Sequence, residues 1–398
     1  DLDLLVKGSF DQRDVQGSVN LNSQAFDVVT LDEKPLLAKC DQLALDFTGD
    51  LLQLDSLLGT LHLKAGNLTL HSGEDAYLDS ADVALASDIR LGLSRQTLGL
   101  KEAQLALADY TLSLEGEAQR DTATGDIRMD LRYRTETWPL KEALAFIPEA
   151  LIGNALDGLD LDGRIGLAGT VTGHYNEQEK PPITSDVTLD DGTFAMKDFP
   201  FPFDRINSQF HVDLDPNNLT NVTIKELSAY TSRNHITAQG TVKGLLGKML
   251  FDLALKGDLQ MQDFKKLLPE SITRFNANAK ADLKASFDQS QISSKAFDKM
   301  NVKGHILFTN LDFLYDDSLA LKSPSLDLDL DFPVKERPYR IGEWAHLIAN
   351  APHLTGSKTG LGDVTAADAH LDAYVNNLFD STLTFKMGTT YQFATRKF

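Results

Sequence analysis

The segment Ser325–Phe332 reads Ser-Leu-Asp-Leu-Asp-Leu-Asp-Phe, so that polar and apolar residues alternate without interruption. Successive side chains of a β-strand point to opposite faces, which places Leu326, Leu328 and Leu330 together on one face. The aspartates then share the other face. A helix would distribute the same residues around its circumference. The segment therefore predicts a strand with one apolar face and one solvated face.

The same alternation recurs along most of the chain. Further apolar positions of this kind are Leu43, Leu45, Phe47, Ile127, Met129, Leu131, Phe210, Val212, Leu214, Phe251, Leu253 and Leu255. Turn signals such as Gly49-Asp50 and Asp191-Gly192 separate the alternating stretches, which succeed one another about every 10 residues. This spacing predicts an antiparallel sheet that is dry on one face and wet on the other.

Helical spacing of apolar residues is confined to three short segments. They run from Trp138 to about Ala155, from Met261 to about Ile272, and from Ile341 to about Asn350. Pro148 and Pro269 interrupt the first two, because proline cannot continue a helix. The sequence therefore predicts a mainly β fold with a few short helices.

A repeat of about 120 residues links these elements. Leu144–Glu149 resembles Lys265–Glu270, which lies 121 residues later (Pro148 to Pro269). Leu100-Lys101-Glu102 likewise matches Ile224-Lys225-Glu226 at an offset of 124 residues. Two further strands follow the same pattern: Leu112, Leu114 and Gly116 match Ile236, Ala238 and Gly240, and Ile127, Met129 and Leu131 match Phe251, Leu253 and Leu255.

The repeat predicts four regions. Residues 1–40 hold the first strands, residues 41–155 form repeat unit one, and residues 156–275 form repeat unit two. Residues 276–398 are expected to hold a partial third unit and C-terminal strands to which no role is assigned. Repeats of this kind imply an architecture that grows along one axis.

The net charge of the chain limits the classes of molecule that it is expected to bind. The 398 residues include 38 basic and 58 acidic side chains, for a net charge of −20. Nucleic acid is not expected as a partner, since binding to its backbone needs clustered cations. Docking onto an anionic membrane through a basic face is disfavoured for the same reason.

The sequence contains no catalytic or metal-binding motif. None of the nine histidines belongs to a pair with helical ligand spacing. The single cysteine, Cys40, excludes an internal disulfide and a Cys-x-x-Cys pair, and we expect it to be a small buried hydrophobe. The sequence accordingly predicts no enzymatic activity, no cofactor and no metal.

Phe199-Pro200-Phe201-Pro202-Phe203 is the most unusual stretch. Proline prevents pairing within a sheet, so the stretch is expected at an edge or in a loop. It is interpreted either as a hydrophobic plug over the core or as a lip at which a lipid tail enters.

The segment from Leu161 to Glu270 resembles the AsmA family, whose members are similar to TamB and to chorein-type bridge-like lipid transfer proteins. The resemblance lies in the order of short motifs: Leu161-Asp162-Gly163-Arg164-Ile165-Gly166-Leu167-Ala168-Gly169, Val187–Phe194 with its Asp191-Gly192 turn, Phe203–Phe210, and His235-Ile236-Thr237-Ala238-Gln239-Gly240. It extends by pattern over roughly residues 40–330.

This resemblance implies a long, strongly curved antiparallel sheet in the form of a U-shaped trough or open roll, whose apolar face holds acyl chains. It also implies the periplasm of a Gram-negative bacterium, phospholipid transport and a part in outer-membrane biogenesis. The chain begins at Asp1 and shows no anchor, so we expect it to be a fragment or mature form. The membrane anchor is expected in the full-length parent.

The residues leave other functions open. The alternative is a structural or adhesive envelope protein whose apolar faces are all covered in a closed core, without lipid. A glycan-active solenoid enzyme is a third hypothesis, although solenoid repeats are usually about 20–30 residues long and a unit of about 120 residues fits them poorly. The lipid, the direction of transport and the protein partners do not follow from the sequence.

Overall fold

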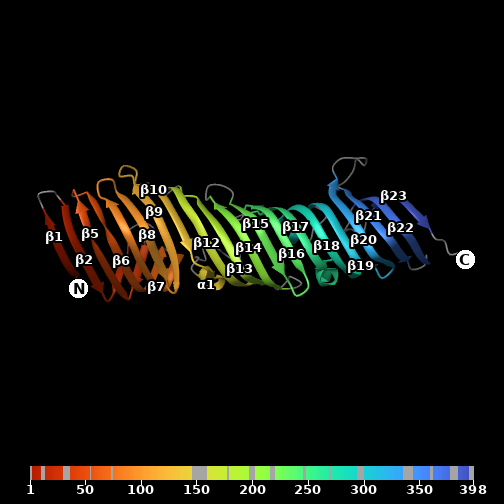
Figure 1. Cartoon of the computed structure of the whole chain (residues 1–398), viewed down its shortest axis with the longest axis horizontal. Coiled ribbons are helices and arrows are strands. Elements are labelled where there is room, and N and C mark those ends of the chain that lie inside the picture. Colours follow the sequence, from red (N-terminus) through yellow and green to blue (C-terminus); the bar gives the residue numbers. More distant parts are fainter. Residues whose placement is uncertain are drawn as a thin grey trace. The chain divides into compact units, whose positions relative to one another are not determined.

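The computed structural model describes most of the chain from residue 2 to residue 393. Outside the described residues lie 10–13, 30–35, 54, 73–74, 146–158, 177–178, 197–201, 216–219, 245–247, 269, 294–299, 335–343, 359–361 and 377–383. The fold is mainly β, with one long antiparallel sheet and few short helices, as the alternation predicts (Figure 1).

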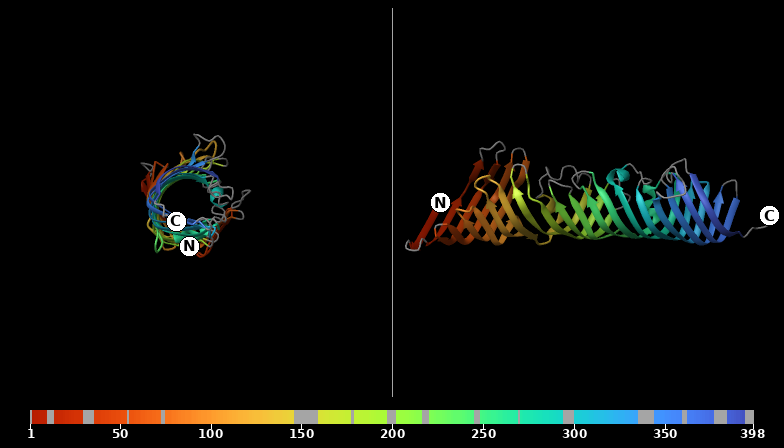
Figure 2. Two further views of the ribbon diagram at one scale, coloured as in Figure 1. Left: turned by 90° about the vertical axis from the view of Figure 1, so that its right-hand side faces the viewer. Right: turned by 90° about the horizontal axis from the view of Figure 1, so that it is seen from above.

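The chain divides into two compact units, and the strands lie side by side within each of them (Figure 2). Unit 1 comprises residues 1–190 and 211–220, and unit 2 comprises residues 191–210 and 221–398. Strands β13 (Ile183–Met196) and β14 (Phe203–Leu214) contain residues of both units.

Unit 1 is built from short-range strand pairing. Its strands are β1 (Leu2–Ser9), β2 (Asp14–Ser23), β3 (Phe26–Val29), β4 (Leu36–Cys40), β5 (Gln42–Leu52), β6 (Ser56–Ser72), β7 (Asp75–Gly92), β8 (Thr97–Leu107), β9 (Tyr110–Arg120), β10 (Ile127–Thr135), β11 (Trp138–Pro139) and β12 (Leu159–Tyr175). From β5 to β10 each strand pairs with the next one in the chain. Strand β2 pairs with β5, so that the β3–β4 hairpin joins the sheet separately through β4 and β6. The helix α1 (Leu140–Ala145) follows β11.

Unit 2 is a continuous antiparallel meander. Its strands are β15 (Asn221–Tyr230), β16 (His235–Lys243), β17 (Leu250–Gln260), β18 (Ile272–Asp288), β19 (Asn301–Tyr315), β20 (Leu319–Val334), β21 (Trp344–Lys358), β22 (Gly362–Asn376) and β23 (Thr384–Phe393). Each pairs with its successor. The 3-10 helix η3 (Met261–Leu267) and the helix α3 (Gln289–Ser293) interrupt the series.

Two sequence predictions about the backbone are wrong. The sheet is neither closed nor strongly curled, whereas a strongly curved trough or roll was expected. Alternation determines which face a side chain occupies, but curvature depends on twist and bulges, which alternation does not encode. The helix expected from Ile341 to Asn350 is also wrong, because the described part of that segment lies in strand β21. Its pairing with both β20 and β22 overrides a local spacing that resembles a helix.

The repeated motif has the same backbone geometry in both units. Strand β8 carries a bulge between Leu100 and Ala103, and β15 carries one between Ile224 and Leu227. The glycines opposite these bulges, Gly116 and Gly240, have φ angles of 142° and 145°. Their missing side chains leave room for the carbonyl oxygens of the next strand, which lie 2.1 and 2.0 Å from where a Cβ would stand. Glycine is therefore required at both positions.

Strand register corrects one part of the predicted repeat. Gly116 lies opposite Leu131, and Gly240 lies opposite Leu253, so Leu131 corresponds to Leu253 rather than to Leu255. The chain between the glycine and its partner leucine is two residues longer in unit 1, which the constant offset of 124 did not anticipate. The predicted boundaries of the repeat units stay a prediction.

Candidate functional site

A row of leucines crosses six strands of unit 1. The strands β2, β5, β6, β7, β8 and β9 each contribute one leucine, and neighbouring leucines lie directly opposite one another: Leu21, Leu45, Leu63, Leu85, Leu105 and Leu112. At about 4.8 Å between strands, this unit 1 row is about 24 Å long. All six leucines are only half-buried, so the row forms an apolar surface that the described residues do not cover.

Unit 2 contains an equivalent row across strands β17 to β22. Its members, which are also directly opposed, are Leu255, Leu283, Gly304, Leu330, Leu347 and Ala373. A second row lies two residues away on the same face and comprises Gly257, Ala281, Ile306, Leu328, Ala349 and Leu371. Apart from Ala373, every member of both unit 2 rows is half-buried.

The set of buried residues shows how little of the apolar surface is covered. Among the described residues, only two leucines are buried, Leu140 and Leu311. Alanine accounts for much of the buried apolar set. Apart from Leu140 and Leu311, the leucines whose burial the structure describes therefore remain at least partly exposed.

In unit 1, one end of the apolar face is closed by β11 and α1. Trp138 is buried, and its ring lies 5.3 Å from that of Tyr110 at the start of β9. Leu140, the first residue of α1, is also buried. Tyr110 lies opposite Leu107, two residues along the strands from Leu105 and Leu112 of the unit 1 row. The part of the apolar face that β11 and α1 close is therefore next to this row.

In unit 2, the corresponding end carries a small core. Ala277, Ala279, Phe308 and Leu311 are buried together, and Met261 of η3 packs against them. Polar contacts hold η3 there: Gln260 N donates to Asn234 Oδ1 (2.7 Å), and Asn234 Nδ2 donates to Asp263 Oδ2 (2.9 Å). Ile306 and Leu328 of the second unit 2 row pack against this core. Leu283 of the first row lies four residues from Ala279 on β18, or about 13 Å further along the strand.

The opposite face of unit 2 is charged. Lys256 Nζ lies 3.0 Å from Asp282, and Lys303 Nζ lies 2.7 Å from Asp331. His305 and His346 lie 2.7 and 2.8 Å from Asp327 and Asp372, respectively. These pairs join neighbouring strands on a solvated surface, as expected for the polar face.

The described site residues predicted from the sequence lie in strands and are half-buried. They are Leu43, Leu45, Phe47, Ile127, Met129, Leu131, Phe210, Val212, Leu214, Phe251, Leu253, Leu255, Leu326, Leu328 and Leu330. Leu45, Leu255, Leu328 and Leu330 belong to the rows. Whether any of these residues binds lipid stays a prediction.

Only part of the predicted lip can be placed. Phe199 and Phe201 lie outside the described residues. Phe203 is half-buried at the start of β14, and its ring lies 6.2 Å from that of Phe194 in β13. Of the three phenylalanines of the predicted lip, Phe203 therefore packs against the neighbouring strand β13.

Sequence reasoning missed several members of the rows, among them Leu21, Leu85 and Leu347. Each lies in an alternating stretch, so the face could have been inferred locally. Their membership in one row depends on the register of strands that are distant in the sequence. Gly304, with a φ of 153°, was missed because its role appears only opposite Leu283 and Leu330.

Cys40 is buried, as predicted. Burial raises the pKa of its thiol, and the neighbouring Asp41 carboxylate raises it further. A raised pKa reduces the thiolate fraction and hence nucleophilicity. Within the described residues, no cluster of three or more histidine, cysteine, aspartate or glutamate side chains could hold a metal ion.

None of the described helices is both long and apolar enough to cross a bilayer. Comparisons with protein-family models, curated proteins and solved structures found no match.

Proposed function

We propose that this chain is a lipid-binding part of an AsmA-type protein of the bacterial envelope, and that its sheet carries phospholipid acyl chains. The observation that carries the proposal is the pair of open apolar faces. The unit 1 row and the unit 2 rows present half-buried leucines without a covering layer in the described residues. An apolar sheet face is normally covered by another sheet, by helices or by a ligand.

Acyl chains suit this surface. Each methylene group that leaves water gains about 0.8 kcal/mol, so a tail lying along a row of opposed leucines gains several kcal/mol in total. The contact is non-directional, which allows a chain to slide along the face. The acidic charge of −20 favours solubility and disfavours association between copies of the chain.

Three further parts of the proposal come from the resemblance described above. By that resemblance, the chain functions in the periplasm and supports outer-membrane assembly, and its parent is anchored in the inner membrane. On this reading the protein is a carrier and not an enzyme.

The test is native mass spectrometry of the freshly purified protein, together with organic extraction and lipid analysis. We expect bound phospholipid at a defined stoichiometry. A mass that matches the chain alone, with no lipid in the extract, would favour the structural alternative without a lipid ligand.

A matched pair of variants locates the binding face. Leu253→Asp introduces a charge on the apolar face of β17. Ala254→Asp places the same charge one residue further along, on the opposite and exposed face of the strand. We expect lipid content to fall in the first variant and to stay at the wild-type level in the second. Equal lipid content in two folded variants contradicts binding on this face. Circular dichroism and the urea midpoint monitor folding.

A further inference from the structure

In each unit, a short helix covers part of the apolar face at a place where one strand ends and another begins. In unit 1, α1 follows β11, and its first residue, Leu140, is buried. In unit 2, η3 connects β17 to β18, and Met261 packs against the small core that contains Phe308. Short helices are therefore the elements that this fold uses to cover the ends of its apolar face.

The apolar face of unit 2 continues beyond the part that η3 covers. Five directly opposed residues form a row across β18 to β22: Phe275, Phe313, Leu321, Gly356 and Val364. The first three pack against the same core as Met261. Val364, at the far end of the row, is 51% exposed. The cover is therefore lost between β20 and β22.

A gap lies within this exposed part of the row. Outside the adjacent residues of the chain, a Cβ on Gly356 would have no neighbour closer than 3.9 Å. The missing side chain leaves space between Leu321 and Val364, which lie opposite Gly356 on either side. Leu319, two residues before Leu321 and on the same face, is 40% exposed. Leu319, Leu321, Gly356 and Val364 together are called the β20–β22 patch.

Carboxylates border the patch and form no ion pair with the described residues. Asp316 and Asp317 stand in the turn that precedes Leu319, Asp363 precedes Val364, and all three are exposed. Lys358 lies opposite Leu319 and supplies one cation. Lys322, next to Leu321, already lies 3.9 Å from Asp312. Among the described residues, carboxylates thus outnumber available cations at this border.

Unit 1 shows how a short helix and such carboxylates meet. Lys141 Nζ of α1 lies 3.4 Å from Asp160 and 3.5 Å from Asp162, at the start of β12. The residue before it, Leu140, is buried. An apolar side chain and a neighbouring lysine therefore contact the sheet and its acidic border at the same time.

We propose that the β20–β22 patch is a docking surface for a short amphipathic helix with apolar residues on one face and lysines beside them. The helix η3 has this composition. Its residues Met261, Phe264 and Leu267 recur every three positions, which places them on one face of a 3-10 helix, and Lys265 and Lys266 lie in its last turn. The patch extends the surface that η3 occupies, so a helix of the same kind fits there. The proposal does not rest on the binding of acyl chains.

Strand pairing and charge favour a helix over other occupants. An extended segment docks through free backbone groups at a sheet edge, but β20, β21 and β22 each pair with a neighbour on both sides. The bordering carboxylates attract lysine and repel an anionic lipid headgroup. An apolar side chain that enters the gap at Gly356 leaves water, which stabilises the complex.

The test is a titration of the delipidated, methyl-labelled full chain with a synthetic peptide of residues 258–270, which contains η3. The methyl NMR signals of Leu319 and Val364 report on the patch directly, and we expect saturable shifts of both. Val364→Asp should weaken binding roughly tenfold or more, because docking would bury a carboxylate under the helix. Leu250→Asp is the matched control, since Leu250 is 48% exposed at the start of β17 and points to the opposite face from Phe251.

Saturable binding that Val364→Asp weakens and Leu250→Asp preserves supports the docking surface. A peptide with Lys265→Glu and Lys266→Glu should bind more weakly, and equal binding of that peptide would contradict the requirement for lysines. Equal losses in the two protein variants overturn the proposal in favour of non-specific adsorption. Unchanged signals at millimolar peptide overturn it as well. Signals that move only with dihexanoylphosphatidylcholine would assign the patch to lipid instead of a helix.

Discussion

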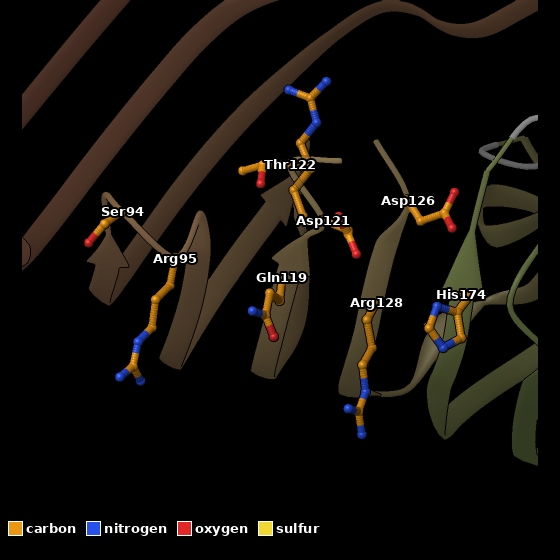
Figure 3. A pocket seen from close by; sticks show the side chains of 9 residues that line it. Ser94, Arg95, Gln119, Asp121, Thr122, Asp126, Arg128 and His174 are labelled. Carbon is orange, nitrogen blue, oxygen red and sulfur yellow. The ribbon is translucent and has the colours of Figure 1, made fainter. Parts of the chain in front are cut away.

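Units 1 and 2 each have an apolar face, but they differ in how their charged side chains are arranged. Both carry rows of directly opposed residues, and both hold a short helix at one end of the strands. In unit 2, lysines and arginines are paired with aspartates across neighbouring strands. In unit 1, Lys141 pairs with Asp160 and Asp162, and Arg95, Arg120 and Arg128 line a cavity together with Asp121 and Asp126 (Figure 3). The comparison teaches that the apolar face follows from the repeated pattern, whereas the use of the polar face is specific to each unit.

The largest expected effect is a difference in stability between the buried core of unit 2 and the half-buried unit 1 row. Leu311→Ala removes a buried side chain from unit 2, and we expect a loss of about 3 kcal/mol in unfolding free energy. Leu105→Ala removes the same atoms from the half-buried unit 1 row, where about 1–1.5 kcal/mol is expected. Urea denaturation of delipidated protein gives both values, and equal losses would show that the row is as well covered as the small core.

The repeated glycines test whether the two units share one backbone geometry. Gly116→Ala and Gly240→Ala each place a Cβ about 2 Å from a carbonyl oxygen at a positive φ. We expect each variant to lose roughly 1–3 kcal/mol. Gly99→Ala serves as control, because its nearest neighbour, the Arg90 Cβ, would lie 3.6 Å away. A loss in only one of the two units would break the structural equivalence.

Asp288 in unit 2 should respond to pH. Hydrogen bonding from the Ser290 hydroxyl, followed by the interaction with Lys248, lowers the pKa of Asp288 from 3.8 to about 2. Lys248 Nζ lies 3.0 Å from the carboxylate, and Ser290 N donates to it at 2.9 Å. The lowered pKa means that the ionised group stabilises the fold fully above about pH 3.8, and that this contribution is lost as the pH falls through 2.

Asp288→Asn should therefore lower the urea midpoint at pH 7 and lose this disadvantage as the pH approaches 2. Ser290→Ala is the companion variant, since it removes the largest cause of the shift and should raise the pKa of Asp288 measured by NMR. A difference between wild type and Asp288→Asn that does not change between pH 6 and pH 2 would contradict this assignment.

The smallest effect compares a cation that forms an ion pair with one that forms no ion pair among the described residues. Lys303→Gln breaks the exposed pair with Asp331 in unit 2, and we expect a loss of about 0.5 kcal/mol or less. Arg132→Gln in unit 1 should leave the unfolding free energy unchanged at low salt. High salt should abolish the difference, because exposed ion pairs are screened. A larger cost for Arg132→Gln would reveal an intramolecular partner.

Much of the secondary structure could be predicted because alternation is a local property. Ser325–Phe332 specifies a strand with no reference to the rest of the chain, and it lies in β20 as expected. The 3-10 helix η3 begins at Met261, where a helical segment was predicted to begin. The acidic residues that alternate with leucine indicate a solvated face, and the paired aspartates of unit 2 lie on one.

The site could be predicted only as a set of faces. Leu45 and Leu63 belong to adjacent alternating stretches, but their opposition depends on the register between β5 and β6. A shift of one residue would send either leucine to the other face. The cavity could not be predicted, because Arg95, Arg128 and His174 meet only after four elements have paired.

The sequence alone determined that this protein is a mainly β chain with a dry face and an acidic, solvated face. Those properties are local, because residues i and i+2 of a strand always point to the same face of the sheet. The tertiary structure decided the register that aligns the leucines, the open form of the sheet and the strand at Trp344–Lys358. It also brought Arg95, Arg120 and Arg128 of unit 1 to the lining of one cavity. These features depend on hydrogen bonds between strands that lie far apart along the chain, which no local pattern encodes.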